Sequence, residues 1–180
     1  MTTTGAGPPG ERGAPDDGGT RADQGPGDDH TPPPDAGVAL PPGLVTAIDH
    51  VGVAVPDYDA AVEFYRRVFG MRLVHEEVNE DQGVREAMMA VGRSGSCVQI
   101  LAPLSPQSTI AKFLDRSGPG LQQVAYRVED VDAVSAALRQ RGVRLLYETP
   151  RRGTAGSRIN FVHPKDAGGV LVELVEPART

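Results

Sequence analysis

The sequence predicts an α+β fold in which two βαβββ modules form one cupped, eight-stranded mixed sheet with helices on its outside. The stretch 48–76 reappears, with one gap, as the stretch 121–148. A shorter pair repeats further on, VQILAP at 98–103 against VELVEP at 172–177. Polar residues interrupt the apolar pattern at matching places in both copies. Self-similarity at a fixed offset indicates two copies of one supersecondary unit packed together.

The first 43 residues differ in composition from the rest. They hold 10 of the 22 glycines and 9 of the 16 prolines, and no aromatic residue. Such a segment buries too little apolar surface to offset its chain entropy. We therefore expect a disordered acidic tail over 1–43 and one domain over 44–180. Within the domain, module one covers about 46–104, a linker 105–119, and module two about 120–177.

Charge and cysteine content limit the possible partners. The tail carries a charge of −5 out of −6 for the chain, so the remainder, with 16 basic and 17 acidic residues, is nearly neutral. A dedicated nucleic-acid binder would show a basic face. No apolar run is long enough to span a membrane, and the tail lacks the apolar region of a secretory signal. The single cysteine, Cys97, excludes an internal disulfide framework and favours the cytoplasm.

Module one begins with DHVGVAV at 49–55, in which valines alternate with His, Gly and Ala, as in a strand with one small-residue face. Asp57 is suited to cap a helix whose apolar residues have helical spacing and which stops at Gly70. Strands are then expected at 71–76, 84–91 and 97–103.

Module two repeats this order. A strand at 121–128 precedes a helix that begins at Asp130 and stops at Gly142, and strands follow at 143–148, 158–164 and 169–177. The linker lies between proline and glycine breakers and reads as a short helix. Two independent ferredoxin-like domains are the alternative architecture, but the matched polar positions favour a shared cup.

Four of those polar positions suggest a metal site. His50 pairs with Gln123 in the repeat, and Gln99 pairs with Glu173. If the copies pack about a pseudo-twofold axis, the four side chains converge, and His, Gln and Glu donors are typical of a metal site. Glu173 carries most weight, because a carboxylate between apolar residues is costly to bury unless it is paired or bound to a metal.

Further polar residues are candidates for the same cup. Glu86 shares strand parity with apolar neighbours, so its side chain is expected to point into the cup. The alternative is that Glu86 forms a salt bridge with a nearby arginine. Glu86 precedes Gln99 by thirteen residues, the interval that also separates Asn160 from Glu173, so Asn160 is expected in the cup as well. Between Glu148 and Asp166 the chain has basic residues and no acid, which suits a phosphorylated ligand or a solvated loop. These basic residues are Arg151, Arg152, Arg158 and Lys165.

The motifs IDHVGVAV, DQGVRE, GSRINFVHPK and GVLVELVEP together resemble the methylmalonyl-CoA epimerase family of the vicinal oxygen chelate superfamily. The resemblance covers about 46–177. It implies an isomerase that interconverts (R)- and (S)-methylmalonyl-CoA by removing the proton on the carbon alpha to the thioester. It also implies a divalent metal ion, an acyl-CoA substrate and a homodimer, and the basic stretch would hold the coenzyme A phosphates.

Carried over to this sequence, the family's metal ligands fall on His50, Gln99, Gln123 and Glu173, and its acid–base carboxylates on Glu86 and Glu173. The family generally has His where this chain has Gln123. An amide oxygen in place of an imidazole weakens binding of Zn²⁺ and suits Co²⁺, Mn²⁺ or Mg²⁺ better. Co²⁺ is the favoured ion, and Mn²⁺, Mg²⁺ and Zn²⁺ are other possibilities.

Two other functions stay open at this point. One is a glyoxalase-type isomerase acting on a glutathione hemithioacetal, and the other is a metal-free small-molecule binding or resistance protein of the same fold. An extradiol dioxygenase is disfavoured, because it needs two His ligands and the second is absent.

Overall fold

The computed structural model describes residue 40 and residues 43–179. Most of the predicted tail, 1–39 and 41–42, lies outside the described residues. Leu40, assigned to the tail from its composition, packs with Leu44 against a core cluster that includes Val131 and Val134, so the folded part includes it. Within the described part of the chain, no helix is long and apolar enough to cross a membrane.

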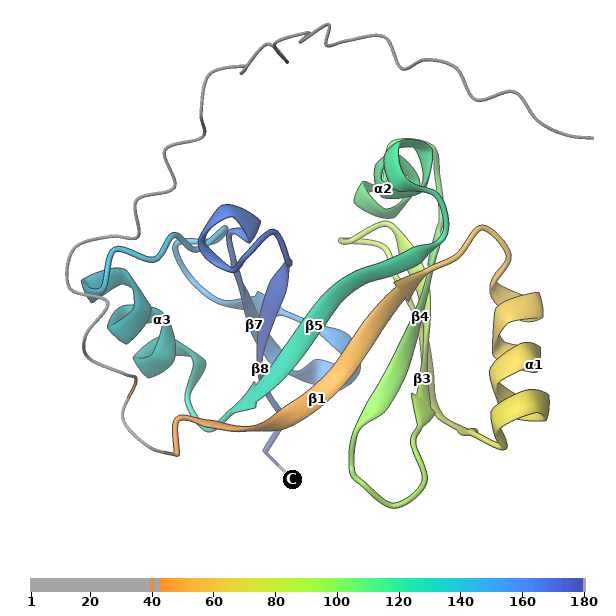
Figure 1. Cartoon of the computed structure of the whole chain (residues 1–180), viewed down its shortest axis with the longest axis horizontal. Helices are drawn as coiled ribbons and strands as arrows, with labels where there is room; N and C mark the ends of the chain where they lie inside the picture. The colour runs from red at the N-terminus through yellow and green to blue at the C-terminus, as the bar shows by residue number, and fades with distance from the viewer. Residues whose placement is uncertain (1–39, 41–42, 180) are drawn as a thin grey trace, which may run out of the picture. The chain divides into compact units, whose positions relative to one another are not determined.

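Eight strands form one mixed sheet in the order β2-β3-β4-β1-β5-β8-β7-β6 (Figure 1). Its centre is made by β1 and β5, which are antiparallel to each other, and each has a parallel neighbour, β4 and β8 respectively. The predicted α+β fold of two βαβββ modules is confirmed. The elements are β1 (Val45–Ala54), α1 (Tyr58–Phe69), β2 (Arg72–Asn79), β3 (Val84–Ala90), β4 (Cys97–Pro103), α2 (Thr109–Ser117), β5 (Gly120–Val128), α3 (Val131–Gln140), β6 (Arg151–Arg152), η1 (Thr154–Gly156), β7 (Arg158–Val162), η2 (Pro164–Asp166) and β8 (Val172–Glu176).

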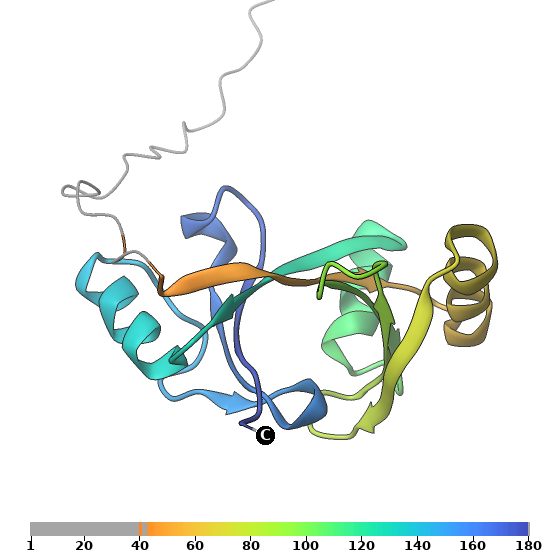
Figure 2. The ribbon, with the colours of Figure 1, turned by 90° about the horizontal axis from the view of Figure 1, so that it is seen from below.

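The two module helices, α1 and α3, lie on the outside of the curled sheet, whereas α2 packs against Ala54, Val84 and Leu101 at one end of its concave side (Figure 2). The two module helices begin in the same way: the carboxylates of Asp57 and Asp130 accept hydrogen bonds from Ala60 N (3.0 Å) and Ala133 N (2.9 Å). Gly70, with φ at 65°, ends α1. Local sequence signals of this kind repeat because the supersecondary unit repeats.

Each of the two module helices covers its own cluster of apolar side chains on the outer face of the sheet. One lies under α1 and includes Ala87, Met89 and Ile100. The other lies under α3 and includes Val162 and Leu174. Because side chains alternate along a strand, the neighbours of these cluster residues in each strand point to the opposite face of the sheet, into the cup.

One expected strand is absent. The stretch 143–148 makes a single bridge, Leu145 to Val162, and the edge of the sheet is the short β6 instead. The side chain of Asn160 replaces the ladder: its Oδ1 accepts from Tyr147 N (3.2 Å) and its Nδ2 donates to Tyr147 O (3.1 Å). An amide side chain thus satisfies backbone groups that a strand would have paired.

Candidate active site

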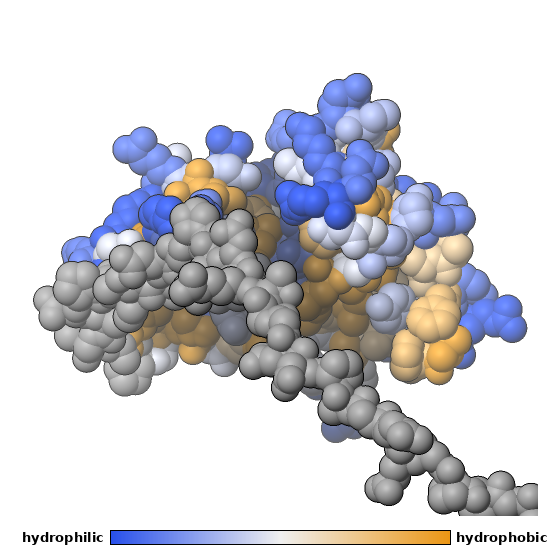
Figure 3. Space-filling view, turned by 45° about the horizontal axis from the view of Figure 1, so that its top comes forward, coloured by the Kyte–Doolittle hydropathy of each residue, from blue (hydrophilic) through white to orange (hydrophobic). Residues whose placement is uncertain are grey.

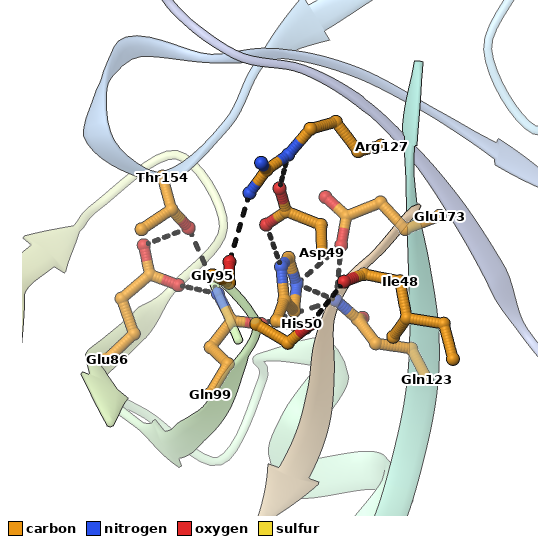
Figure 4. A network of polar contacts seen from close by, with 11 residues as sticks. Ile48, Asp49, His50, Glu86, Gly95, Gln99, Gln123, Arg127, Thr154 and Glu173 are labelled. Carbon is orange, nitrogen blue, oxygen red and sulfur yellow. Dashed lines mark hydrogen bonds and ion pairs between the residues drawn. The ribbon is translucent and has the colours of Figure 1, made fainter. Parts of the chain in front are cut away.

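The four predicted ligand residues meet at the centre of the concave face. They come from the four adjacent strands β4, β1, β5 and β8, and each is at most 6 % exposed. The Nε2 atom of Gln123 lies 3.3 Å from Oε1 of Gln99, 3.4 Å from Nε2 of His50 and in short contact with Oε2 of Glu173. His50 Nε2 is 3.1 Å from the same Glu173 oxygen (Figure 4).

Gly52 makes this convergence possible. It pairs with Gln99 on one side and Gln123 on the other. A Cβ atom at Gly52 would lie 2.6 Å from the Cγ atom of Gln123, closer than real contacts allow. The small residue on the polar face of β1 therefore leaves room for the Gln123 side chain.

Asp49 and Arg127 hold the His50 ring from its Nδ1 side, opposite the Nε2 atom that faces Glu173 and Gln123. Asp49 Oδ1 lies 3.0 Å from His50 Nδ1, and Arg127 Nε donates to Asp49 Oδ2 (2.8 Å). Burial lowers the pKa of His50, but hydrogen bonds to the Asp49 and Glu173 carboxylates outweigh it and raise this pKa to about 9. Burial also opposes ionisation of Asp49, yet His50 and Arg127 hold its pKa below the ordinary value. Sequence reasoning missed both residues, although an Asp directly before a candidate His ligand was a usable signal.

Glu86 projects from β3 and is 1 % exposed. It accepts hydrogen bonds from Gln99 Nε2 (2.8 Å) and from Thr154 Oγ1 (3.0 Å), and among the described residues it pairs with no arginine. Burial raises its pKa to about 7; the Thr154 hydrogen bond opposes this shift, and the charges of Glu77 and Glu173 add to it. In Figure 4, Glu86 and Glu173 lie on opposite sides of the His50 and glutamine group.

Thr154 was not predicted, because it lies in the loop of η1. It also accepts from Gln99 Nε2 (3.0 Å). The next residue, Ala155, has a positive φ of 54°, and its N–H donates to Glu77 Oε2 on β2 (3.2 Å). This loop of module two thus reaches module one, and backbone strain at a loop beside buried carboxylates is typical of functional sites.

A cavity of about 700 Å³ leads from the polar group toward α2. Gln99, Gln123 and Glu173 lie at its inner end, and apolar residues, among them Leu101 and Ile110, form part of its wall. Figure 3 shows apolar residues deep in a recess with hydrophilic residues around its rim. A smaller cavity of about 280 Å³ reaches His50 and Glu173 from the side of Asp49 and Arg127.

The predicted basic residues divide into two groups. Arg151 and Arg152 line the larger cavity, with Arg151 stacked 3.9 Å from the centre of the Tyr147 ring. Arg158 lines neither cavity; it pairs with Asp132 on α3 (2.6 Å) and with Glu176, so this placement does not support the expected contact with a phosphorylated ligand. Lys165 is exposed in η2 and lines neither cavity.

Asn160 also lies outside the cup. It is fully buried and donates to Ser135 Oγ on α3 (3.3 Å), so the expectation that it faces substrate is wrong. In module one, Gln99 pairs with Met88, which precedes it by eleven residues. In module two, the equivalent residue Glu173 pairs with Phe161, which precedes it by twelve residues. A difference of one residue moves a side chain to the other face of a sheet.

The donor set fits a cation. Because two of the four groups are glutamines, the described residues contain no cluster of three His, Cys, Asp or Glu side chains. However, the Gln123 NH₂ group has two hydrogens and faces three polar atoms, Oε1 of Gln99, Nε2 of His50 and Oε2 of Glu173. A half-turn of that amide would bring its oxygen to the same point, giving one nitrogen and three oxygen donors around a single position.

Comparison with known proteins agrees with this arrangement. A family model, the glyoxalase/bleomycin resistance protein/dioxygenase superfamily, matches residues 49–161. The structure of methylmalonyl-CoA epimerase from Mycobacterium tuberculosis is 62 % identical, with a TM-score of 0.75 over 78 % of this chain and 94 % of that one.

Two further relatives point the same way. A variant of the Streptomyces coelicolor methylmalonyl-CoA epimerase, solved with 2-nitronate-propionyl-CoA, is 49 % identical, with a TM-score of 0.72 over 75 % of this chain and 99 % of that one. The ethylmalonyl-CoA/methylmalonyl-CoA epimerase of Cereibacter sphaeroides is 34 % identical over 73 % of this chain and 98 % of its own length. The chain therefore belongs to the glyoxalase/bleomycin resistance protein/dioxygenase superfamily and, within it, to the methylmalonyl-CoA epimerase family.

Proposed function

We propose that the protein is an isomerase that interconverts (R)- and (S)-methylmalonyl-CoA. Its relatives carry that activity in their names, and one solved relative of 49 % identity is a complex with methylmalonyl-CoA and NH₄⁺. One observation in this chain carries the proposal. Two buried carboxylates, Glu86 and Glu173, come from different modules and flank one polar group at the inner end of a large cavity.

Epimerisation needs a base on one face of a carbon and an acid on the other. The carbon between the thioester and the free carboxylate loses its proton to one glutamate, and the electron pair moves into the enolate. The other glutamate then gives a proton to the opposite face. A pKa of about 7 suits Glu86 to both roles, because a catalytic group works best when its pKa is near the working pH.

His50, Gln99, Gln123 and Glu173 would hold one divalent metal ion. Co²⁺ is favoured, with Mn²⁺, Mg²⁺ or Zn²⁺ as alternatives, and the oxygen-rich donor set makes Zn²⁺ the weaker of these. When bound, the ion would stabilise the negative charge of the enolate. Glu173 would then serve as ligand and as acid–base group. The Asp49–His50 contact supports this assignment, because it keeps the Nδ1 proton outside the site and turns Nε2 inward.

The remaining assignments are proposals of the same kind. Arg151 and Arg152, at the cavity, would contact the phosphates of coenzyme A, and Lys165 would act further out. The family resemblance favours a homodimer. The single cysteine, Cys97, which is partly buried and unbonded, favours the cytoplasm.

A direct test uses purified protein loaded with Co²⁺ and one epimer of methylmalonyl-CoA in D₂O. We expect inversion and incorporation of deuterium at the alpha carbon. The hemithioacetal of methylglyoxal and glutathione is the control substrate. Isomerisation of that compound, with no inversion of the thioester, would assign the protein to the glyoxalase type instead.

A further inference from the structure

The pairing of β1 with β5 contains irregularities at equivalent positions of the two modules. Between the pairs Ile48–Tyr126 and His50–Ala125, β1 has one extra residue, Asp49. Further along the same ladder the pairing passes from Gly52–Gln123 to Val53–Leu121, and β5 has one extra residue, Gln122. In the internal repeat, position 49 corresponds to position 122. Each module therefore has a bulge directly before its first ligand position.

A bulge redirects a side chain that would otherwise point to the other face of the sheet. Asp49 and the adjacent His50 both line the smaller cavity, although neighbours in a regular strand face opposite sides. Gln122 and the adjacent Gln123 likewise both line the larger one. The two bulged residues thus occupy equivalent places at the two ends of the site.

Their hydrogen bonding is different. Both carboxylate oxygens of Asp49 are paired, one with His50 and one with Arg127. The Oε1 atom of Gln122 is buried and has no partner; among the described residues only Ser157 Oγ shares that condition. Leaving a buried acceptor without a donor is energetically costly, so such an atom beside a cavity is suited to a donor that arrives with a ligand.

The position of Gln122 in the cavity indicates which N–H group of a bound substrate could donate to its Oε1 atom. The larger cavity runs from Gln123 and Glu173, where the reacting carbon would lie, toward Thr109 and Ile110 on α2. Gln122 is one residue nearer to α2 than Gln123, and a strand rises about 3.3 Å per residue. With the reacting carbon at Glu173, the arm of an acyl-CoA thioester would follow this path, and its first N–H donor is a secondary amide two carbons from the sulfur.

We propose that Gln122 is a substrate-positioning residue whose side-chain oxygen accepts a hydrogen bond from the amide of the thioester arm nearest the sulfur. This rests on the proposed function, because it takes an acyl-CoA thioester as substrate. The contact holds the thioester at a fixed distance from the two glutamates and distinguishes an amide-bearing thioester from a plain alkyl one.

The test measures kcat/KM for inversion with three thioesters of methylmalonate: the CoA ester, the N-acetylcysteamine ester, which keeps only the first amide, and an S-alkyl ester of equal length without an amide. Gln122→Leu removes the acceptor at similar size. We expect a loss of about tenfold with the CoA and N-acetylcysteamine esters, and a change within twofold with the alkyl ester. Gln122→Asn, which withdraws the amide by one carbon, should lose activity in the same selective way.

Gln140→Leu is the matched control, because Gln140 is exposed at the end of α3. It should leave all three rates unchanged. An equal loss with all three esters in both Gln122 variants would mean a structural role, and unchanged rates with the amide esters would mean no contact; either result overturns the assignment. A wild-type protein that inverts none of the esters would instead contradict the proposed function.

Discussion

The two modules share a backbone plan but differ in the polar groups they bring to the cup. Module one has Glu86 on β3, opposite Leu101 of β4. The equivalent place in module two, opposite Val175 of β8, is held by Ile159, an apolar residue that is 1 % exposed. The internal repeat thus supplies a symmetric scaffold, whereas the proposed chemistry uses a place where the two modules differ. One glutamate on each side of the site arises from non-equivalent strands, β3 and β8.

The largest effect is expected for the carboxylate of module two. Glu173→Gln should abolish inversion and weaken metal binding together, because Glu173 is proposed as ligand and acid–base group. Inversion should fall by more than the roughly 10²–10⁴-fold typical of one positioned acid or base. Metal content after dialysis and inversion rate are measured on the same samples. Stoichiometric metal in a His50→Ala, Glu173→Ala double variant would exclude this metal site.

The carboxylate of module one should behave differently. Glu86→Gln keeps the size of the side chain but removes the base, so inversion should fall by about 10² or more while metal binding is retained. With Glu173 still in place, deuterium from solvent should enter one epimer without inversion. Glu129→Gln, at an exposed position after β5, is the matched control. Full inversion activity in Glu86→Gln would contradict the two-base assignment.

The support behind His50 should give a smaller effect. Asp49→Ala removes the acceptor of the Nδ1 proton and leaves Arg127 without its carboxylate partner. We expect metal affinity to fall by about 10–100-fold, as for other partners of metal-bound histidines. Asp49→Asn should recover much of that loss, because an amide oxygen still accepts from Nδ1. An unchanged Co²⁺ titration in Asp49→Ala would show that this contact does not orient the ligand.

Restoring symmetry between the modules should sharpen the metal site. Gln123→His gives module two an imidazole at the position equivalent to His50, and we expect severalfold tighter binding of Zn²⁺ and Co²⁺, which accept nitrogen donors readily. Mg²⁺, which prefers oxygen ligands, should bind more weakly in the same variant. Competition titrations with a chelator measure both. A loss of Zn²⁺ affinity would mean that position 123 is not a ligand.

The sequence allowed prediction of the scaffold and of the residues that the repeat marks. Strand parity, the capping residues Asp57 and Asp130, and the pairing of positions 50 with 123 and 99 with 173 all follow from local pattern. The expectation for Asn160 failed because the connection between β7 and β8 is one residue longer than that between β3 and β4, which reverses parity, and interval counting does not detect that. Arg158 was named from the charge of its segment, and charge alone does not show that Asp132 and Glu176 pair with it. Thr154 and Gln122 were missed for a related reason. One lies in an irregular loop and the other at a bulge, so no strand pattern predicts where either side chain points.

The smallest expected effect concerns Asn160, the polar residue of module two that does not join the cup. Asn160→Ala removes the acceptor for the N–H of Tyr147 (3.2 Å) and Phe161 (2.8 Å) and the donor to Tyr147 O. We expect the free energy of unfolding to fall by about 1–3 kcal/mol, the usual consequence of leaving buried partners unpaired, with a drop of several degrees in Tm. At a temperature where the variant is folded, KM for the thioester should equal that of the wild type. A raised KM with unchanged Tm would return Asn160 to the substrate site and contradict the register that turns it toward α3.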